Sequence, residues 1–109
     1  MPIINEKNQL FTVMVVFEVD PEYQHALIEG ITEQVTQHFK GNSGFVSASF
    51  HVSEDGRKVV NYAQWRSREA WETITSDESK TAVIVETIER CGVKSFYNEV
   101  IRVERVIEN

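Results

Sequence analysis

Apolar and polar residues alternate along three stretches of the chain with the two-residue period of β-strands. The first stretch runs from Leu10 to Val19, the second from Phe45 to Val52, and the third from Lys58 to Trp65. The first is apolar on both of its faces, which predicts a strand that is covered on both sides. Glu54-Asp55-Gly56 separates the second stretch from the third and is typical of a hairpin turn.

Helical periodicity separates and follows these strands. Apolar residues recur every four positions after Asp20, which predicts a helix over 21–39 with Asp20 as its cap and proline at its first position. A second helical region is expected after Ser67, with a break at Thr75 to Asp77. The alternation returns from Lys94 to Ile107 and predicts a long final strand.

The predicted order is β-α-β-β-α-β, which is typical of a ferredoxin-like α+β fold with an antiparallel sheet and helices on one face. The 109 residues are expected to form a single domain, 1–109. Because the strands are apolar on both faces and the helices cover only one, a monomer would expose the apolar side chains of the other face to water. We therefore expect a homodimer in which two sheets pack together, with the last strand pairing with the partner or reaching over it.

Composition narrows the range of partners. A net charge of −6 without any block of lysine or arginine argues against nucleic acid and against an anionic membrane as partner. We find no charged-then-apolar leader and no apolar run that approaches a membrane span. The single cysteine, Cys91, rules out an intrachain disulfide and suits a reducing compartment, so we expect a cytoplasmic protein.

The sequence contains no phosphate loop, dinucleotide fingerprint, paired-cysteine motif or His-Glu-x-x-His motif, so no bound cofactor or metal is predicted. Of its three histidines, His25 lies beside the apolar stripe of the first helix and is expected to be solvated. His38 falls near the end of that helix, where a cation is favoured. By alternation His51 shares a strand face with Phe45, Ser47 and Ser49, and that face is either a pocket wall or an edge.

Asn61 and two tryptophans are the strongest candidates for a binding site. Asn61 shares a strand face with Val59, Ala63 and Trp65, and a buried amide costs free energy unless it is hydrogen-bonded. Either the backbone satisfies Asn61, or its side chain lines a cavity in which a ligand or water satisfies it. Trp65 and Trp71 alone are ordinary core residues. Together with Asn61 they predict an aromatic wall with one amide, which suits a flat, partly polar organic molecule.

The run Asn61-Tyr62-Ala63-Gln64-Trp65, followed by Ser67-Arg68-Glu69-Ala70-Trp71, resembles the antibiotic biosynthesis monooxygenase (ABM) family. These are small dimeric ferredoxin-like proteins, called dimeric α+β barrels, and the resemblance covers a core of about 10–106. It implies oxidation of polycyclic phenols to quinones with O2 as co-substrate and without metal, flavin or haem.

The resemblance also implies that Asn61 and Trp65 line the pocket and take part in catalysis. Trp71 is expected to position the aromatic substrate, and His51 and His38 are further candidates for contact with it. Either histidine is a candidate proton acceptor, and the sequence does not decide between them, since it cannot place them relative to Asn61.

Three alternatives stay open. A haem-degrading branch of the same fold needs a first-strand asparagine and a later histidine, where this chain has Met14-Val15-Val16 and Thr75, so axial ligation has no candidate. A non-catalytic dimeric module would keep the pocket but not turnover, and replacing Asn61 would then change an affinity rather than a rate. An enzyme that modifies a small oxygenated metabolite would need a smaller and more polar pocket.

Overall fold

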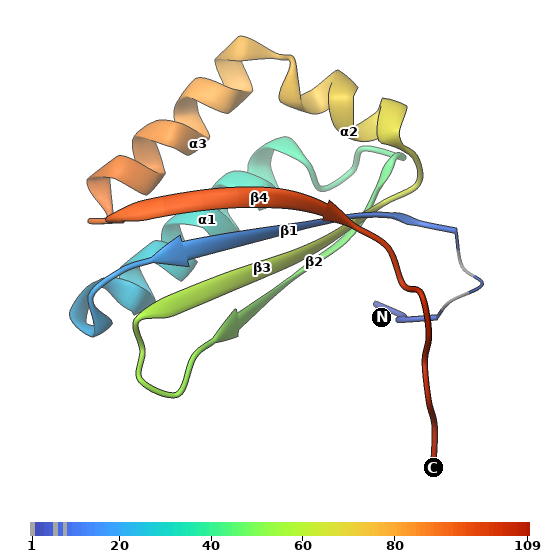
Figure 1. The fold of residues 1–109 in the computed structure, drawn as a ribbon. Coiled ribbons are helices and arrows are strands. Elements are labelled where there is room, and N and C mark those ends of the chain that lie inside the picture. The colour runs from blue at the N-terminus through green and yellow to red at the C-terminus, as the bar shows by residue number, and fades with distance from the viewer. Residues whose placement is uncertain (1, 6, 8) are drawn as a thin grey trace.

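A four-stranded antiparallel sheet with the strand order β2-β3-β1-β4 carries the fold (Figure 1). The computed structural model describes residues 2–5, 7 and 9–109. Its strands are β1 (Phe11–Glu18), β2 (Phe45–Val52), β3 (Lys58–Trp65) and β4 (Ser95–Ile101). β1 is central and pairs with both β3 and β4. The predicted ferredoxin-like order is confirmed.

The helices lie on one face of the sheet (Figure 1). A short 3-10 turn, η1 (Pro21–Tyr23), leads into α1 (Gln24–His38), while α2 (Arg68–Thr75) and α3 (Glu78–Arg90) form an arch above the sheet. α3 packs mainly against α1. Among the described residues, no helix is both long and apolar enough to cross a membrane.

Side-chain caps explain why the second helical region divides in two, as predicted. The Ser67 hydroxyl accepts a hydrogen bond from the Ala70 amide and starts α2. The Asp77 carboxylate accepts from the amides of Ser79 and Lys80 and starts α3. α3 includes the strand-prone run 83–85, so the cap and the burial of its inner face outweigh intrinsic β-propensity there.

Asp20 does not cap the first helix, contrary to expectation. It occupies the cap position of η1, but its side chain makes no capping hydrogen bond. Its Oδ1 lies 2.9 Å from Nζ of Lys94 instead, in an ion pair that joins the end of β1 to the start of β4. The Asp20 carboxylate therefore pairs with a residue distant in sequence instead of capping the helix as the local pattern predicted.

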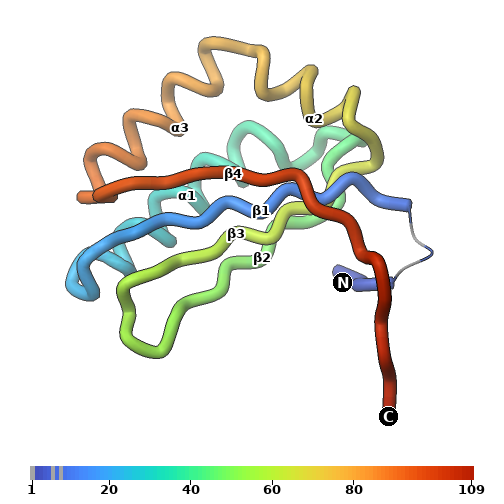
Figure 2. Tube along the Cα trace, viewed as in Figure 1, coloured from blue at the N-terminus to red at the C-terminus, as the bar shows by residue number. Residues whose placement is uncertain are grey.

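The final strand is shorter than the predicted 94–107. It ends at Ile101, which pairs with Thr12, and β1 begins only one residue before Thr12. Beyond that point the chain has no neighbouring strand to pair with. Residues 102–109 leave the sheet and run away from the body of the molecule (Figure 2), and Ile107 is 89% exposed.

A bulge in β2 overturns the predicted facing of Phe45. Strict alternation places Phe45 with Ser47 and Ser49, but the register shifts between Phe45 and Ser47. Phe45 consequently lies opposite Trp65, and their ring centroids are 5.2 Å apart. Phe45 thus belongs to the helix-covered face, because a bulge adds one residue and reverses the side on which later side chains emerge.

Two groups of buried side chains form the core beneath the helices. One group joins α1 and α3 to the sheet: Phe17, Val19, Leu27, Ile31, Val59 and Ile88. The other joins α2 to the sheet: Val13, Ala63, Trp65 and Ile74. Val15 packs against both groups, which places it at the middle of the interface between helices and sheet.

The opposite face of the sheet carries no helix and is partly covered by the N-terminal segment. Gln64, which is 1% exposed, donates a hydrogen bond from Nε2 to the carbonyl of Ile3 at 2.8 Å. Its Oε1 accepts one from the Ser47 hydroxyl at 3.0 Å. This buried amide is hydrogen-bonded at both ends, as burial of a polar group requires.

Leu27→Ala tests the core. Leu27 is fully buried, so the substitution removes packed methyl groups and leaves a cavity, and we expect a loss of about 2–5 kcal/mol in the free energy of unfolding. Urea denaturation followed by circular dichroism measures it. Val52→Ala, at an exposed apolar residue, serves as control and should cost less than about 1 kcal/mol. Equal losses in the two variants would contradict this description of the core.

Candidate active site

A cavity of about 390 Å³ lies between the sheet and the helices. Its floor consists of helix-facing side chains of β1, β3 and β4, and its roof is the inner face of α3. Trp71 and Ile74 of α2 contribute to its wall. Most of the lining is aliphatic or aromatic, with a few polar groups. That volume and that composition are typical of sites for small organic molecules.

Asn61 is the polar group on the cavity floor. Its Oδ1 is buried, and no described group of the protein donates a hydrogen bond to it. Of the two explanations that the sequence left open, the backbone therefore does not satisfy this oxygen, and the side chain lines a cavity. A buried acceptor without a partner costs about 1–3 kcal/mol, so the free protein holds an acceptor ready for a donor that enters the cavity.

Trp65 forms a fixed part of the wall. The residue is 2% exposed, and Phe39 and Phe45 contact its ring at centroid distances of 5.5 and 5.2 Å with steeply inclined planes. Edge-to-face contacts of this kind are favourable for aromatic pairs. Trp65 is thus both a core residue and part of the cavity wall.

Trp71 contributes a second indole from α2. Its ring packs against Phe11 at a centroid distance of 5.4 Å, and the Arg68 guanidinium lies 4.8 Å from the centre of the Phe11 ring. These contacts hold Trp71 against the start of β1. Trp65 and Trp71 therefore line one cavity, as the sequence predicted.

The two candidate histidines lie elsewhere. His51 pairs with Val60 on the helix-free face of the sheet, is exposed, and has Nε2 3.3 Å from the Ser49 hydroxyl. His38 is the last residue of α1 and does not line the cavity. Within one chain the structure therefore brings neither histidine to Asn61. His25 is on the surface, 3.9 Å from the Glu29 carboxylate.

Two cavity residues were not singled out from the sequence. Asn98 of β4 lies opposite Val15, which in turn lies opposite Asn61, so the two asparagines flank Val15 on one row of the sheet. The pairing register of three strands brings the two asparagines together, and local pattern does not predict that register. Lys80 lies in the first turn of α3, and its spacing to Ile84 and Ile88 was the available signal, because residues four apart share a helix face.

The remaining polar groups of the lining are already engaged. The Thr75 hydroxyl donates to the Trp71 carbonyl, and the Thr81 hydroxyl donates to the Thr75 carbonyl, both at 2.9 Å. Thr75 stands where the haem-degrading branch would need a histidine, and its hydroxyl is committed to the helix. No group of three or more potential metal-ligating side chains was found among the described residues.

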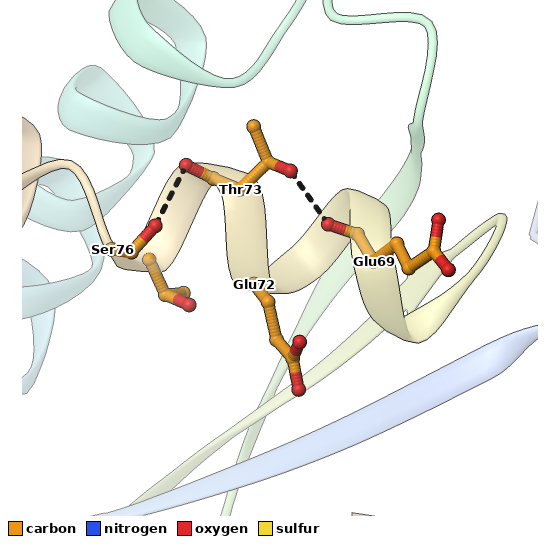
Figure 3. A pocket seen from close by; sticks show the side chains of 5 residues that line it. Glu69, Glu72, Thr73 and Ser76 are labelled. Carbon is orange, nitrogen blue, oxygen red and sulfur yellow. Dashed lines mark hydrogen bonds between the residues drawn. The ribbon is translucent and has the colours of Figure 1, made fainter.

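A larger hollow, of about 690 Å³, lies on the outer surface of α2 (Figure 3). Its five lining residues are all exposed and lie within positions 69–76. The Thr73 and Ser76 hydroxyls are hydrogen-bonded to helix carbonyls, and the Glu69 and Glu72 side chains point in different directions. It is an open surface depression without converging groups, so the smaller and less open cavity between sheet and helices is the better candidate.

Comparison with known proteins identifies the family of this chain. Residues 10–83 match the antibiotic biosynthesis monooxygenase family. The chain therefore belongs to that family, and the predicted resemblance is confirmed.

Individual relatives cover most of the chain. Tetracenomycin-F1 monooxygenase of Streptomyces glaucescens is 42% identical over 77 residues, which are 71% of this chain and 69% of the relative. A monooxygenase from the ActVA-Orf6 gene of Streptomyces coelicolor, solved with nanaomycin D, superposes with a TM-score of 0.86 at 31% identity and covers 99% of both chains. An anthrone oxidase-like protein has a TM-score of 0.76 and 29% identity, over 93% of this chain and 42% of its own.

Asn61→Leu tests the unpaired acceptor. Leucine removes a buried oxygen that lacks a protein donor, so we expect the ligand-free protein to gain up to about 1–3 kcal/mol in the free energy of unfolding. Gln64→Leu is the matched control on the same strand. It removes an amide with two hydrogen bonds and should destabilise the protein. Urea denaturation measures both variants, and a loss in Asn61→Leu as large as in Gln64→Leu would refute the assignment.

Proposed function

We propose that this protein is a cofactor-independent monooxygenase that uses O2 to oxidise an aromatic, polycyclic phenolic compound to a quinone. The observation that carries the proposal is the unpaired Oδ1 of Asn61 in a cavity walled by Trp65 and Trp71. The family supports it, as do two relatives, one named for tetracenomycin F1 and one solved with nanaomycin D. The single cysteine is compatible with the cytoplasm, where we place the protein.

The reaction requires little from the protein beyond binding and electrostatics. An anthrone that has lost a proton is an electron-rich enolate and can reduce O2 directly. A carbon–oxygen bond forms at the ring carbon, and the oxygen–oxygen bond then breaks. One oxygen atom stays as the new quinone carbonyl and the other leaves as water with the two hydrogens of that carbon. The protein favours the anion and excludes bulk water from it.

Asn61 is placed to act on the oxygen of the substrate. Its Oδ1 can accept a hydrogen bond from a phenolic hydroxyl, and its Nδ2 can donate one to the oxyanion that forms. Trp65, fixed by Phe39 and Phe45, gives a flat wall for the rings. Trp71 positions the same rings from α2. We assign the proton acceptor to neither histidine of the same chain, since His51 and His38 lie outside the cavity.

We further propose that the protein is a homodimer formed through the helix-free face of the sheet. Tyr97 of β4 is 54% exposed there, and the half-buried Met14 and Tyr62 pair with each other on the same face. Large exposed aromatic surface is typical of interfaces. The tail after Ile101 leaves its own sheet (Figure 2), and we place it at the partner. In this dimer His51 faces the partner's sheet.

Aerobic turnover of 1,8-dihydroxyanthrone by chelator-treated protein tests the activity. Quinone absorbance and oxygen uptake should both rise above the uncatalysed rate. Asn61→Ala should lower kcat/KM by roughly 10²-fold or more, because it removes a hydrogen bond to the oxyanion, and Trp65→Phe should lower it by a smaller factor. Gln37→Ala removes an exposed amide on α1 and should leave the rate unchanged.

Two results would count against the activity. Loss of turnover on chelation would contradict independence from metal. If the ligand binds without turnover and Asn61→Ala changes only its affinity, the protein is a binding module instead.

Light scattering of Tyr97→Asp tests the dimer. A buried carboxylate without a partner is costly, so the variant should be monomeric at concentrations where the wild type is dimeric. Val52→Asp is the matched control, since Val52 is 52% exposed but lies on the helix-covered side of the edge strand β2. If Tyr97→Asp stays dimeric, or if the wild type is a monomer, the helix-free face is not the interface.

A further inference from the structure

Lys80 is the sole ionisable residue among the described residues that line the cavity. It lies in the first turn of α3, and Lys80, Ile84 and Ile88 follow one another at four-residue spacing along the inner face of that helix. The side chain is half-buried. A cation therefore stands in the roof of a largely apolar cavity, whose floor carries Asn61.

No ion pair among the described residues involves the Lys80 ammonium. Asp77, the capping residue of α3, lies three residues before Lys80, and its Oδ1 is occupied in capping. It accepts hydrogen bonds from the Ser79 hydroxyl at 2.7 Å, the Ser79 amide at 3.1 Å and the Lys80 amide at 3.5 Å. The Ser79 hydroxyl is the main cause that lowers the pKa of Asp77, and the charge of Lys80 is a minor one.

The other charged groups around Lys80 point to the surface. Glu69 and Glu72 line the open hollow on α2, and Glu78, Glu86 and Glu89 line another on the outer side of α3. The elements that face Lys80 across the cavity, β1, β3, β4 and α1, contribute apolar side chains and the two amides Asn61 and Asn98. Within the described lining, no anion balances the cation.

We propose that Lys80 binds the ionised hydroxyl of an aromatic ligand, so that the cavity selects the phenolate over the neutral phenol. The inference deepens the proposed function and rests on its substrate class. An opposite charge within about 4–6 Å lowers the pKa of an acid by 1–3 units, and more so where water is excluded. The proton passes to solvent when the anion binds, so no carboxylate or imidazole is needed inside the cavity.

The arrangement also orients the ligand. Lys80 is on the roof and Asn61 on the floor, so a flat molecule between the indoles presents one oxygen to each. Lysine supplies a compact point charge on a flexible stem, which suits a single phenolate oxygen better than a planar, bidentate anion. A polycyclic phenol with separated oxygen atoms fits these two groups.

Spectrophotometric titration of bound alizarin (1,2-dihydroxyanthraquinone) tests the proposal. This dye is already a quinone, and its visible absorption changes when its hydroxyl ionises. Both tryptophans of the chain line the cavity, so quenching of their fluorescence reports that the dye occupies it. With wild-type protein we expect the ionisation midpoint of bound dye to fall at least about one pH unit below that of free dye.

Variants assign the shift to one residue. Lys80→Met should return the midpoint to that of free dye, and Lys80→Arg should keep most of the shift because it keeps the charge. Lys58→Met removes an exposed lysine at the start of β3 and should leave the wild-type midpoint unchanged. The proposal is overturned if wild-type protein fails to bind the dye, fails to lower its midpoint, or lowers it equally in Lys80→Met.

Turnover of 1,8-dihydroxyanthrone separates this inference from the proposed function. If the ionisation midpoint of bound alizarin depends on Lys80 but the anthrone is not oxidised, the monooxygenase activity is refuted and the anion site at Lys80 is supported. Oxidation whose pH profile is the same in Lys80→Met and wild type would refute the anion site and leave the monooxygenase. If both hold, the acidic limb of the kcat/KM profile should move to higher pH in Lys80→Met.

Discussion

The pairing of β1 with its two neighbours is the constraint on which the site depends. β1 lies between β3 and β4, and its Val15 stands opposite Asn61 on one side and Asn98 on the other. A shift of either pairing by one residue would turn every side chain of the shifted strand to the other face. The helices then only need to cover this floor, and the break at Asp77 lets α2 and α3 arch over it. Cavity and core thus follow from a single register.

Two amides on β3 show how burial is used differently on the two faces of the sheet. Gln64 faces away from the helices and binds both Ser47 and the backbone of Ile3, so it fastens the N-terminal segment to the sheet. Asn61, three residues earlier, faces the helices and keeps an acceptor without a protein donor. The first amide serves the structure. The second destabilises the free protein and can form its hydrogen bond only when a ligand binds. Functional sites commonly lower the stability of a fold in this way.

Local pattern predicted most of the fold and half of the site. The strands, the hairpin and the caps at Ser67 and Asp77 depend on neighbours in sequence, and Asn61, Trp65 and Trp71 could be placed together by alternation and helix phase. The failures in the predicted fold depend on partners that are distant in the sequence. Asp20 forms an ion pair with Lys94 instead of capping the helix. β4 ends at Ile101 because its partner strand β1 begins there. A bulge against β3 places Phe45 on the helix-covered face. Lys80 and Asn98 escaped notice because only tertiary packing reveals which polar residues meet across a cavity.

The bulge in β2 is a position at which the size of the cavity can change during evolution. β2 is an edge strand, so its register can alter without disturbing the pairs that β1 makes with β3 and β4. Deletion of Val46 would remove the bulge and keep Phe45 opposite Trp65, whereas deletion of Phe45 would place the smaller Val46 there and leave space beside Trp65. After that second deletion the indole of Trp65 would have room to tilt towards β2, which widens the site. A single-codon deletion at the margin of the sheet is therefore a route to larger ligands that spares the central strands.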